Sequence, residues 1–285
     1  MPSIALLTNP DSGQGNADDV ERLLREAGAE VTSFRIAEHE RAAAAGVDRI
    51  AVAGGDGSIA CAAGSAARAG VPLAVIPTGT ANDFAAALGL PPEVEAACEL
   101  AVRGETRRPM ELAFAGERAF VNIASVGLSP TAAEHADQMK SQFGALAYTF
   151  GAIEAGVTAD PIHCRVTCDG DLRHEGEVWQ ISIGSTGAFG GGSSIESNTS
   201  DGKLDLVVIE GSSRIRLVGR AYGLKAGKVE AQKGVIHERC AEVELSLPDD
   251  ECLNIDGELV ESGDLIADGT LRFRCEQDAF ELIVG

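Results

Sequence analysis

Two short apolar runs dominate the hydrophobic pattern in the first third of the chain. Ile50–Ala53 and Leu73–Ile76 each contain four consecutive apolar residues, and each ends at a turn rich in Gly, Pro, Asp or Thr. Continuous apolar runs of this length are typical of strands that are buried on both faces of a parallel sheet. The Ala-rich segment between the two runs is therefore predicted to be the crossover helix.

The remainder of the first 120 residues also alternates between strand and helix patterns. Strands are predicted at Ile4–Leu7 and Val31–Ile36, and helices at Asp18–Ala27 and Pro92–Arg103. Gly28 is a candidate C-cap for the first of these helices. Strands that alternate with helices predict an α/β domain with a parallel sheet over residues 1–120.

From about residue 121 the pattern changes to strands that are separated by turn residues. The predicted strands are Phe120–Ala124, His163–Cys168, Val178–Ile183, Leu204–Ile209, Ala241–Leu247, Leu253–Ile255 and Leu271–Cys275. Helices are expected at Ser141–Gly156 and Ser213–Ala226. This texture predicts an antiparallel β-sandwich as a second domain over residues 121–285, whose last residues are free to return to the first domain.

Composition and charge narrow the classes of protein that fit. The chain has 285 residues, of which 45% are hydrophobic and 24% charged, as in an ordinary folded protein. Its formal net charge of −21 argues against a nucleic-acid partner, whose phosphates it would repel. A cytoplasmic protein is expected, because the N-terminus lacks the basic region of a signal peptide and no apolar stretch has the length of a membrane span. The seven cysteines show no C-x-x-C pair, so reduced and mostly buried thiols are expected.

Polar turns follow both buried apolar runs. Gly54–Ser58 contains three glycines within four positions, immediately before the predicted helix. Backbone N–H groups at such a turn, with a helix N-terminus behind them, form a cradle suited to phosphate. Pro77–Phe84 repeats the arrangement with hydroxyls and an amide that can bond ribose or phosphate oxygens. Ligands bind at the carboxyl ends of parallel strands, so these turns predict a binding site; the alternative is two plain tight turns.

A third turn, N-P-D-S-G-Q-G at residues 9–15, follows the first predicted strand. Together with GGDGS at 54–58 and PTGTANDFA at 77–85, it resembles the catalytic domain of the diacylglycerol kinase family, and within it the soluble bacterial and archaeal lipid kinases. The resemblance implies an NAD kinase/phosphofructokinase-like first domain, ATP and Mg²⁺ as cofactors, and a neutral lipid such as diacylglycerol as phosphoryl acceptor. By the same resemblance, the nucleotide contacts Asn9, Pro10, Ser12, Gly13, Gly54, Gly55, Asp56, Gly57, Ser58, Thr80 and Asn82.

Two Asp-Gly turns in the second domain also resemble family motifs. The segment N-T-S-D-G-K-L-D at 198–205 is similar to the family's D-G-x-L-D segment, which implies a magnesium-bound water network at Asp201 with the carbonyls of Asn198 and Lys203. The segment LNIDGE at 253–258 is similar to the family's L-N-x-D-G-E. It implies that Asp256 and Glu258 are the catalytic carboxylates that accept the alcohol proton, and Asp56 joins them in contact with the nucleotide or metal. The pairs Asp169-Gly170 and Asp268-Gly269 are predicted to be hairpin turns only.

The chain departs from the family pattern directly after GGDG. Ser58 replaces Thr, and Ala60 and Cys61 stand where the family commonly has Asn and Glu. These losses leave open a nucleotide- or lipid-binding module without catalysis, and the shared GGDG turn leaves open an NAD kinase-like or other small-molecule kinase. A Rossmann oxidoreductase is disfavoured because no G-x-G-x-x-G follows the first strand.

A basic segment offers a route to a membrane surface. Residues 212–234 contain six Arg and Lys residues and one acid, Glu230. The apolar residues over Arg214–Lys225 fall at helical spacing, so an amphipathic helix with a basic flank is predicted. Its bases either neutralise nearby carboxylates or approach anionic headgroups in a transient, peripheral membrane contact. The sequence leaves a homodimer open.

Overall fold

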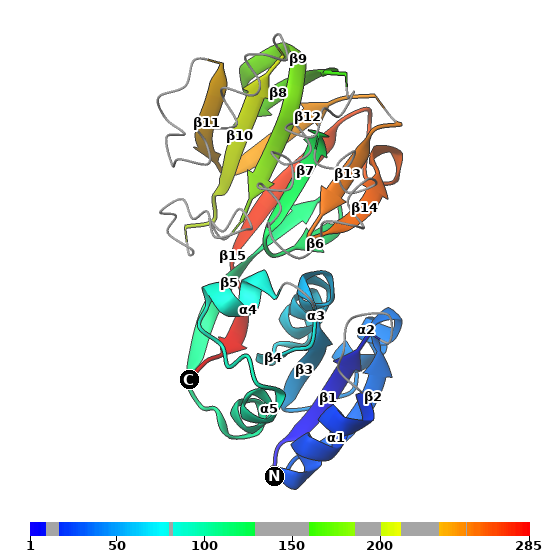
Figure 1. Ribbon diagram of the computed structural model, residues 1–285, viewed down its shortest axis with the longest axis vertical. Helices are drawn as coiled ribbons and strands as arrows, with labels where there is room; N and C mark the ends of the chain where they lie inside the picture. Colours follow the sequence, from blue (N-terminus) through cyan, green and yellow to red (C-terminus); the bar gives the residue numbers. More distant parts are fainter. Residues whose placement is uncertain (10–16, 80–81, 129–159, 186–200, 212–233, 249) are drawn as a thin grey trace. The chain divides into compact units, whose positions relative to one another are not determined.

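The computed structural model describes residues 1–9, 17–79, 82–128, 160–185, 201–211, 234–248 and 250–285 (Figure 1). The predicted helices at Ser141–Gly156 and Ser213–Ala226, with the basic segment, lie outside these residues. The chain divides into unit 1, Met1–Leu112 with Glu276–Gly285, and unit 2, Ala113–Cys275. The division falls within strands β5 (Arg107–Ala115) and β15 (Leu271–Ile283), which contribute residues to both units, so the predicted boundary after residue 120 lies inside unit 2.

A parallel sheet forms the centre of unit 1. Strands β1 (Ser3–Thr8), β2 (Glu30–Arg35), β3 (Arg49–Gly54) and β4 (Leu73–Pro77) lie in the order β4-β3-β1-β2, and the end of β15 pairs with β4. The helices are α1 (Ala17–Glu26), α2 (His39–Ala43), α3 (Asp56–Ala69), α4 (Asp83–Ala87) and α5 (Val94–Arg103), with a 3₁₀ turn at Ile36–Glu38. The strand–helix–strand prediction around the two apolar runs is confirmed by β3, α3 and β4.

Burial in unit 1 explains why its strands are continuously apolar. All residues of β4 and all residues of β3 except Arg49 are buried. Helix α3 packs on β3, and helices α1 and α5 pack against each other (Figure 1). Leu24 of α1 and Cys98 of α5 join Leu6 and Ile76 of the sheet in one apolar cluster. A strand that is covered on both faces has no solvent-facing position to mark with a polar residue.

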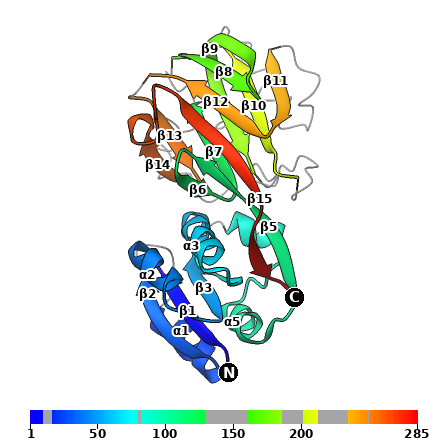
Figure 2. The ribbon, with the colours of Figure 1, turned by 180° about the vertical axis from the view of Figure 1, so that it is seen from behind.

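Unit 2 consists of antiparallel strands (Figure 2). The strands β14-β13-β7-β9-β8-β12-β15 are neighbours in that order, β10 also pairs with β9, β11 with β10, and β6 with β5. Their bounds are β6 Arg118–Phe120, β7 Ile123–Gly127, β8 Ile162–Cys168, β9 Asp171–Gly184, β10 Leu204–Glu210, β11 Val235–Cys240, β12 Glu242–Ser246, β13 Cys252–Ile255 and β14 Glu258–Glu261, with a 3₁₀ turn at Ser262–Asp264. The inward residues form one core, in which Phe120 and Phe273 meet edge to face with ring centroids 6.5 Å apart.

Strands β6, β11 and β14 of unit 2 were not expected from the sequence, although Phe120 at the end of β6 belonged to a predicted strand. Strand β11 includes His237, Glu238 and Arg239, a polar run without the apolar alternation that predicts a strand. These side chains are paired with Asp205, Arg173 and Asp201, respectively. Strand β14 has only four residues. Strand β15, predicted to end at Cys275, continues to Ile283.

The expectation that all cysteines are reduced is wrong for one pair. Cys168 and Cys240 form a disulfide with their Cα atoms 5.6 Å apart, although 72 residues separate them in the sequence. The other five cysteines are not disulfide-bonded, and Cys98 and Cys164 are the buried ones among them. Sequence spacing did not reveal the pair because strand pairing in unit 2, and not a local motif, brings the ends of β8 and β11 together.

Among the described residues, no helix is both long enough and apolar enough to cross a membrane.

Candidate functional site

The turn between β3 and α3 presents a helix N-terminus at the carboxyl edge of the sheet. Gly55 is the N-cap of α3, has an extended backbone (φ −97°, ψ −171°) and supplies no side-chain cap. The first helical residues are Asp56, Gly57 and Ser58, and the helix continues for 14 residues to Ala69. Helix N-termini attract anions through their N–H groups and the helix dipole, so this turn has the chemistry of a phosphate site.

A second turn, after β4, lies directly against the first. A Cβ added to Gly79 would lie 2.5 Å from the Cα of Gly55, so only glycine permits this approach. The N–H of Thr78 donates to the carbonyl of Gly54 at 3.2 Å. The two glycine turns that the sequence singled out are therefore neighbours in space.

Asp56 links these turns through its side chain. Its two carboxylate oxygens accept hydrogen bonds from the backbone N–H groups of Asp83 at 3.2 Å and Phe84 at 3.0 Å, at the start of α4. Burial, followed by the charge of Asp56, raises the pKa of the Asp83 carboxyl. Asp56 thus positions the second turn from the first.

Asn82 fixes the shape of the second turn. It has left-handed backbone geometry (φ 53°), its Oδ1 accepts from the N–H of Gly79 at 3.0 Å, and its Nδ2 donates to the Gly79 carbonyl at 2.9 Å. Thr80, the other predicted contact in this turn, lies outside the described residues.

Asn9 brings the end of β1 to the same edge. Its Nδ2 donates to Ser58 Oγ at 3.4 Å, which joins the first turn of the chain to the start of α3. Pro10, Ser12 and Gly13 lie outside the described residues. Asn9, Gly55 and Gly79 therefore mark three turns that meet at the carboxyl ends of β1, β3 and β4.

In unit 2, Asp256 organises the hairpin between β13 and β14. It has left-handed geometry (φ 48°), and its carboxylate accepts from the backbone N–H groups of Val121 (2.8 Å), Asn122 (2.9 Å) and Ile123 (3.0 Å). Its own N–H donates to the Ile123 carbonyl at 2.9 Å. Asp256 therefore holds the hairpin against the segment that leads into β7.

Glu258 is placed differently from Asp256. It is an exposed residue at the start of β14, and its carboxylate forms an ion pair with Arg118. Solvent therefore reaches this carboxylate. Of the two predicted catalytic carboxylates, Glu258 is the more accessible and Asp256 the more constrained.

In the predicted magnesium segment, an arginine side chain pairs with the Asp201 carboxylate. Asp201 Oδ2 and Oδ1 accept from Arg239 Nη1 and Nη2 at 2.7 and 3.0 Å, and Oδ1 also accepts the N–H of Lys203 at 3.1 Å. Asn198 lies outside the described residues. A guanidinium on both oxygens opposes a divalent cation at the same place, so the described residues do not fit Mg²⁺ at Asp201.

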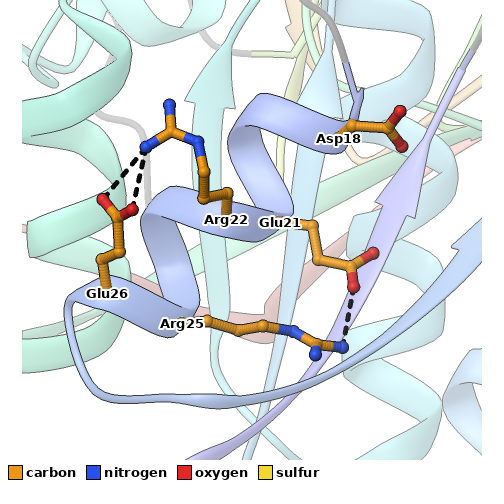
Figure 3. Close-up of a pocket in the computed structure, with 5 residues that line it drawn as sticks. All are labelled: Asp18, Glu21, Arg22, Arg25 and Glu26. Atoms are coloured by element: carbon orange, nitrogen blue, oxygen red, sulfur yellow. Dashed lines mark hydrogen bonds and ion pairs between the residues drawn. The ribbon is translucent and has the colours of Figure 1, made fainter.

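A surface hollow on α1 has no comparable chemistry. It is lined by Asp18, Glu21, Arg22, Arg25 and Glu26, whose side chains come from one helix (Figure 3). Arg22 pairs with Glu26 at 2.9 Å and Arg25 with Glu21 at 2.7 Å (Figure 3). These are exposed pairs at helical spacing, which are typical of a solvated helix face.

Sequence reasoning missed three contributors to these sites. Arg118 and Arg239 are single basic residues without a local motif, and their partners Glu258 and Asp201 lie 140 and 38 positions away. The backbone donors at 121–123 carry no side-chain signal at all. Pairs of this kind become visible only when the strands are assembled.

The fold and these turns define a class of two-domain kinases. A parallel-stranded N-terminal domain with glycine turns at its carboxyl edge is followed by an antiparallel β-sandwich domain that carries a D-G-E hairpin. The family model of the diacylglycerol kinase catalytic domain matches residues 3–113, and that of the YegS C-terminal NAD kinase beta sandwich-like domain matches residues 122–283. The chain belongs to the diacylglycerol kinase family of lipid kinases.

Individual relatives agree with this family. A YegS-like lipid kinase of Pseudomonas aeruginosa is 30% identical over 241 residues, covering 82% of this chain and 78% of that protein. A diacylglycerol kinase of Bacillus subtilis is 30% identical over 217 residues, covering 74% and 71%.

Solved structures show the same fold. A diacylglycerol kinase from Bacillus anthracis superposes with a TM-score of 0.73 at 22% identity, covering 100% of this chain and 97% of that one. An NAD kinase from Archaeoglobus fulgidus in complex with ATP gives a TM-score of 0.55 at 15% identity, covering 99% and 93%. These likenesses support an NAD kinase-like architecture.

Proposed function

We propose that this chain transfers the γ-phosphoryl group of Mg·ATP to a hydroxyl group of a neutral lipid such as diacylglycerol. The observation that carries the proposal is the position of Asn9, Gly55 and Gly79 at one sheet edge, with the Gly79–Gly55 approach and the Asn9–Ser58 hydrogen bond. Membership in a lipid kinase family gives the class of acceptor. ATP as the donor is supported by the ATP complex of the structurally similar NAD kinase.

Unit 1 holds the nucleotide in this proposal. The N–H groups at Gly54–Ser58 and the N-terminus of α3 face the phosphates, and the constrained turn at Asn82 borders them. Residues 1–139 contain no lysine, so no P-loop lysine is available in this part of the chain. Backbone amides and the Mg²⁺ that ATP carries then supply the positive potential that phosphoryl transfer requires.

Unit 2 supplies the acceptor chemistry. Glu258 takes the proton from the lipid hydroxyl, because its carboxylate is exposed while Asp256 is engaged by three backbone donors. Arg118 holds the Glu258 carboxylate in place. Asp256 is then a positioning residue that fixes the hairpin on which Glu258 stands.

The test is a transfer assay with radiolabelled ATP. Purified protein, Mg·ATP and dioleoylglycerol in mixed micelles should give labelled phosphatidic acid, and the same mixture with NAD as acceptor should give no labelled product. Lipid-independent labelling of NAD would replace the proposal by an NAD kinase. ATP binding without transfer to any of a panel of neutral lipids would replace it by a non-catalytic module.

Membrane access is proposed through the basic segment at residues 212–234. At about 1 kcal/mol for each base near an anionic surface, reversing three bases should weaken docking by a few kcal/mol at low salt. The variant Arg216→Glu/Arg220→Glu/Lys228→Glu should sediment less with anionic vesicles and keep its activity on a short-chain, water-soluble acceptor. Unchanged sedimentation would leave the segment as packing only.

A further inference from the structure

A fully buried acid is the last residue of the predicted magnesium segment at 198–205. Asp205 of β10 has no exposed surface, and its register partner on β11 is Arg239. Arg239 Nε lies 3.2 Å from Asp205 Oδ1, and His237 Nε2 lies 3.5 Å from the same oxygen. Burying a carboxylate costs several kcal/mol unless an opposite charge is close, so Asp205 depends on Arg239.

The other side of the same guanidinium is used by Asp201. The two terminal nitrogens of Arg239 donate to the two Asp201 oxygens, while the Arg239 Nε faces Asp205. Arginine is suited to this task because its planar fork is permanently charged and matches a carboxylate in bidentate fashion. One cation therefore joins the Asp201 turn, the start of β10 and strand β11.

We propose that Arg239 replaces the family's metal ion at the Asp201 turn, so that this chain organises residues 201–205 without Mg²⁺ there. Mg²⁺ requires oxygen ligands in octahedral geometry and retains several waters. At this turn both Asp201 oxygens are bonded to a guanidinium, and Asp205 is closed to solvent. The proposal concerns the resident site and leaves untouched the Mg²⁺ that enters with ATP.

The end of β11 is anchored independently of the turn. Cys240, which follows Arg239, is bonded to Cys168 of β8. Beside it, the carboxylate of Asp169 accepts the N–H groups of Ala241 and Glu242, each at 2.9 Å. Arg239 is thus presented by a strand whose end is held by contacts that do not involve Asp201.

The first experiment measures metal binding directly and needs no activity. Mn²⁺, whose free form is visible by electron paramagnetic resonance, is titrated into nucleotide-free wild-type protein and into Asp201→Asn. The two binding curves should superimpose, because residue 201 holds no ion in either protein. A site that binds one Mn²⁺ per wild-type chain and disappears in Asp201→Asn would overturn the proposal.

The second experiment measures stability. Arg239→Met should lower the midpoint of thermal unfolding by roughly 6–20 °C, because it removes the permanently charged partner of the buried Asp205. The control Arg272→Met removes an exposed Arg272–Glu244 pair in the same unit and should shift the midpoint by less than about 4 °C. The 'Arg239 lock' denotes the pairing of Arg239 with Asp201 and Asp205. Equal midpoint shifts in both variants would overturn the proposal that this lock replaces a metal ion. If Arg239→Met does not fold, the Mn²⁺ comparison still decides.

Both results are independent of whether the chain is a lipid kinase, since neither uses ATP or lipid. A failed transfer assay would refute the proposed function and leave the Arg239 lock standing. A Mn²⁺ site at Asp201 would refute the lock and leave the proposed function standing.

Discussion

Replacing Asp256 with Ala tests whether the D-G-E hairpin of unit 2 acts in catalysis or only in folding. The change removes a carboxylate that accepts three backbone N–H groups, from Val121, Asn122 and Ile123. Hydrogen bonds to a charged acceptor contribute about 1.5–3 kcal/mol each, and even the lower value gives about 4.5 kcal/mol for three. The turn is part-buried, so water replaces some of this, and a net loss of about 2–4 kcal/mol in the free energy of unfolding is expected.

The structure provides a matched control in Asp169. This residue also has left-handed geometry (φ 52°) in a hairpin turn, and it also accepts backbone N–H groups, those of Ala241 and Glu242. Asp169→Ala should lose about 1–3 kcal/mol of stability for its two bonds. The corresponding falls in the unfolding midpoint are about 4–16 °C for Asp256→Ala and about 2–12 °C for Asp169→Ala.

Turnover then separates the two aspartates. Measured below both midpoints, Asp256→Ala should lose about two to four powers of ten in kcat, because the hairpin that carries Glu258 is released. Asp169→Ala should stay within about twofold of wild type, since its hairpin carries no residue with a proposed role in catalysis. A wild-type kcat in Asp256→Ala would refute the catalytic assignment of the hairpin, and an unchanged midpoint would refute the hydrogen-bond argument.

Three further outcomes are expected. Gly79→Ala should lower both the unfolding midpoint and the ATP affinity measured by calorimetry, because the added Cβ would lie 2.5 Å from the Cα of Gly55. The control Gly64→Ala in α3 meets nothing within 4 Å and should stabilise the protein by about 0.5–1 kcal/mol. Equal effects of the two substitutions would contradict the close approach. Glu258→Gln should reduce kcat by about 10²-fold or more with little change in stability. The control Glu261→Gln on the same strand should leave kcat and stability unchanged. A fall of kcat in both variants would indicate a disturbed strand and not the loss of a general base. Burial raises the pKa of the Cys164 thiol to about 12. Iodoacetamide labelling of Cys164, followed by mass spectrometry, should therefore be slow at pH 8, increase as the pH approaches that pKa and become rapid in denaturant. Fast labelling of the native protein at pH 8 would contradict the burial.

The sequence by itself determined the parallel-stranded half of the fold and the sheet edge at which its glycine turns lie. The runs at 50–53 and 73–76 became β3 and β4 because strands buried on both faces require apolar residues at every position, which is a local signal. The glycine turns after them were equally legible, since a close backbone approach or a helix N-terminus restricts the residue type at a single position.

Tertiary structure alone decided which strands pair and which side chains contact one another across them. Alternation along a strand reports which residues are buried, but it does not report which strand lies opposite. The pairing of Arg239 with Asp201 and Asp205, and the disulfide between Cys168 and Cys240, therefore arise only when β8, β10 and β11 assemble. Asp256 shows the same limit: its motif could be found in the sequence, whereas the donors that engage it lie more than 130 residues earlier and are backbone groups that every residue type shares.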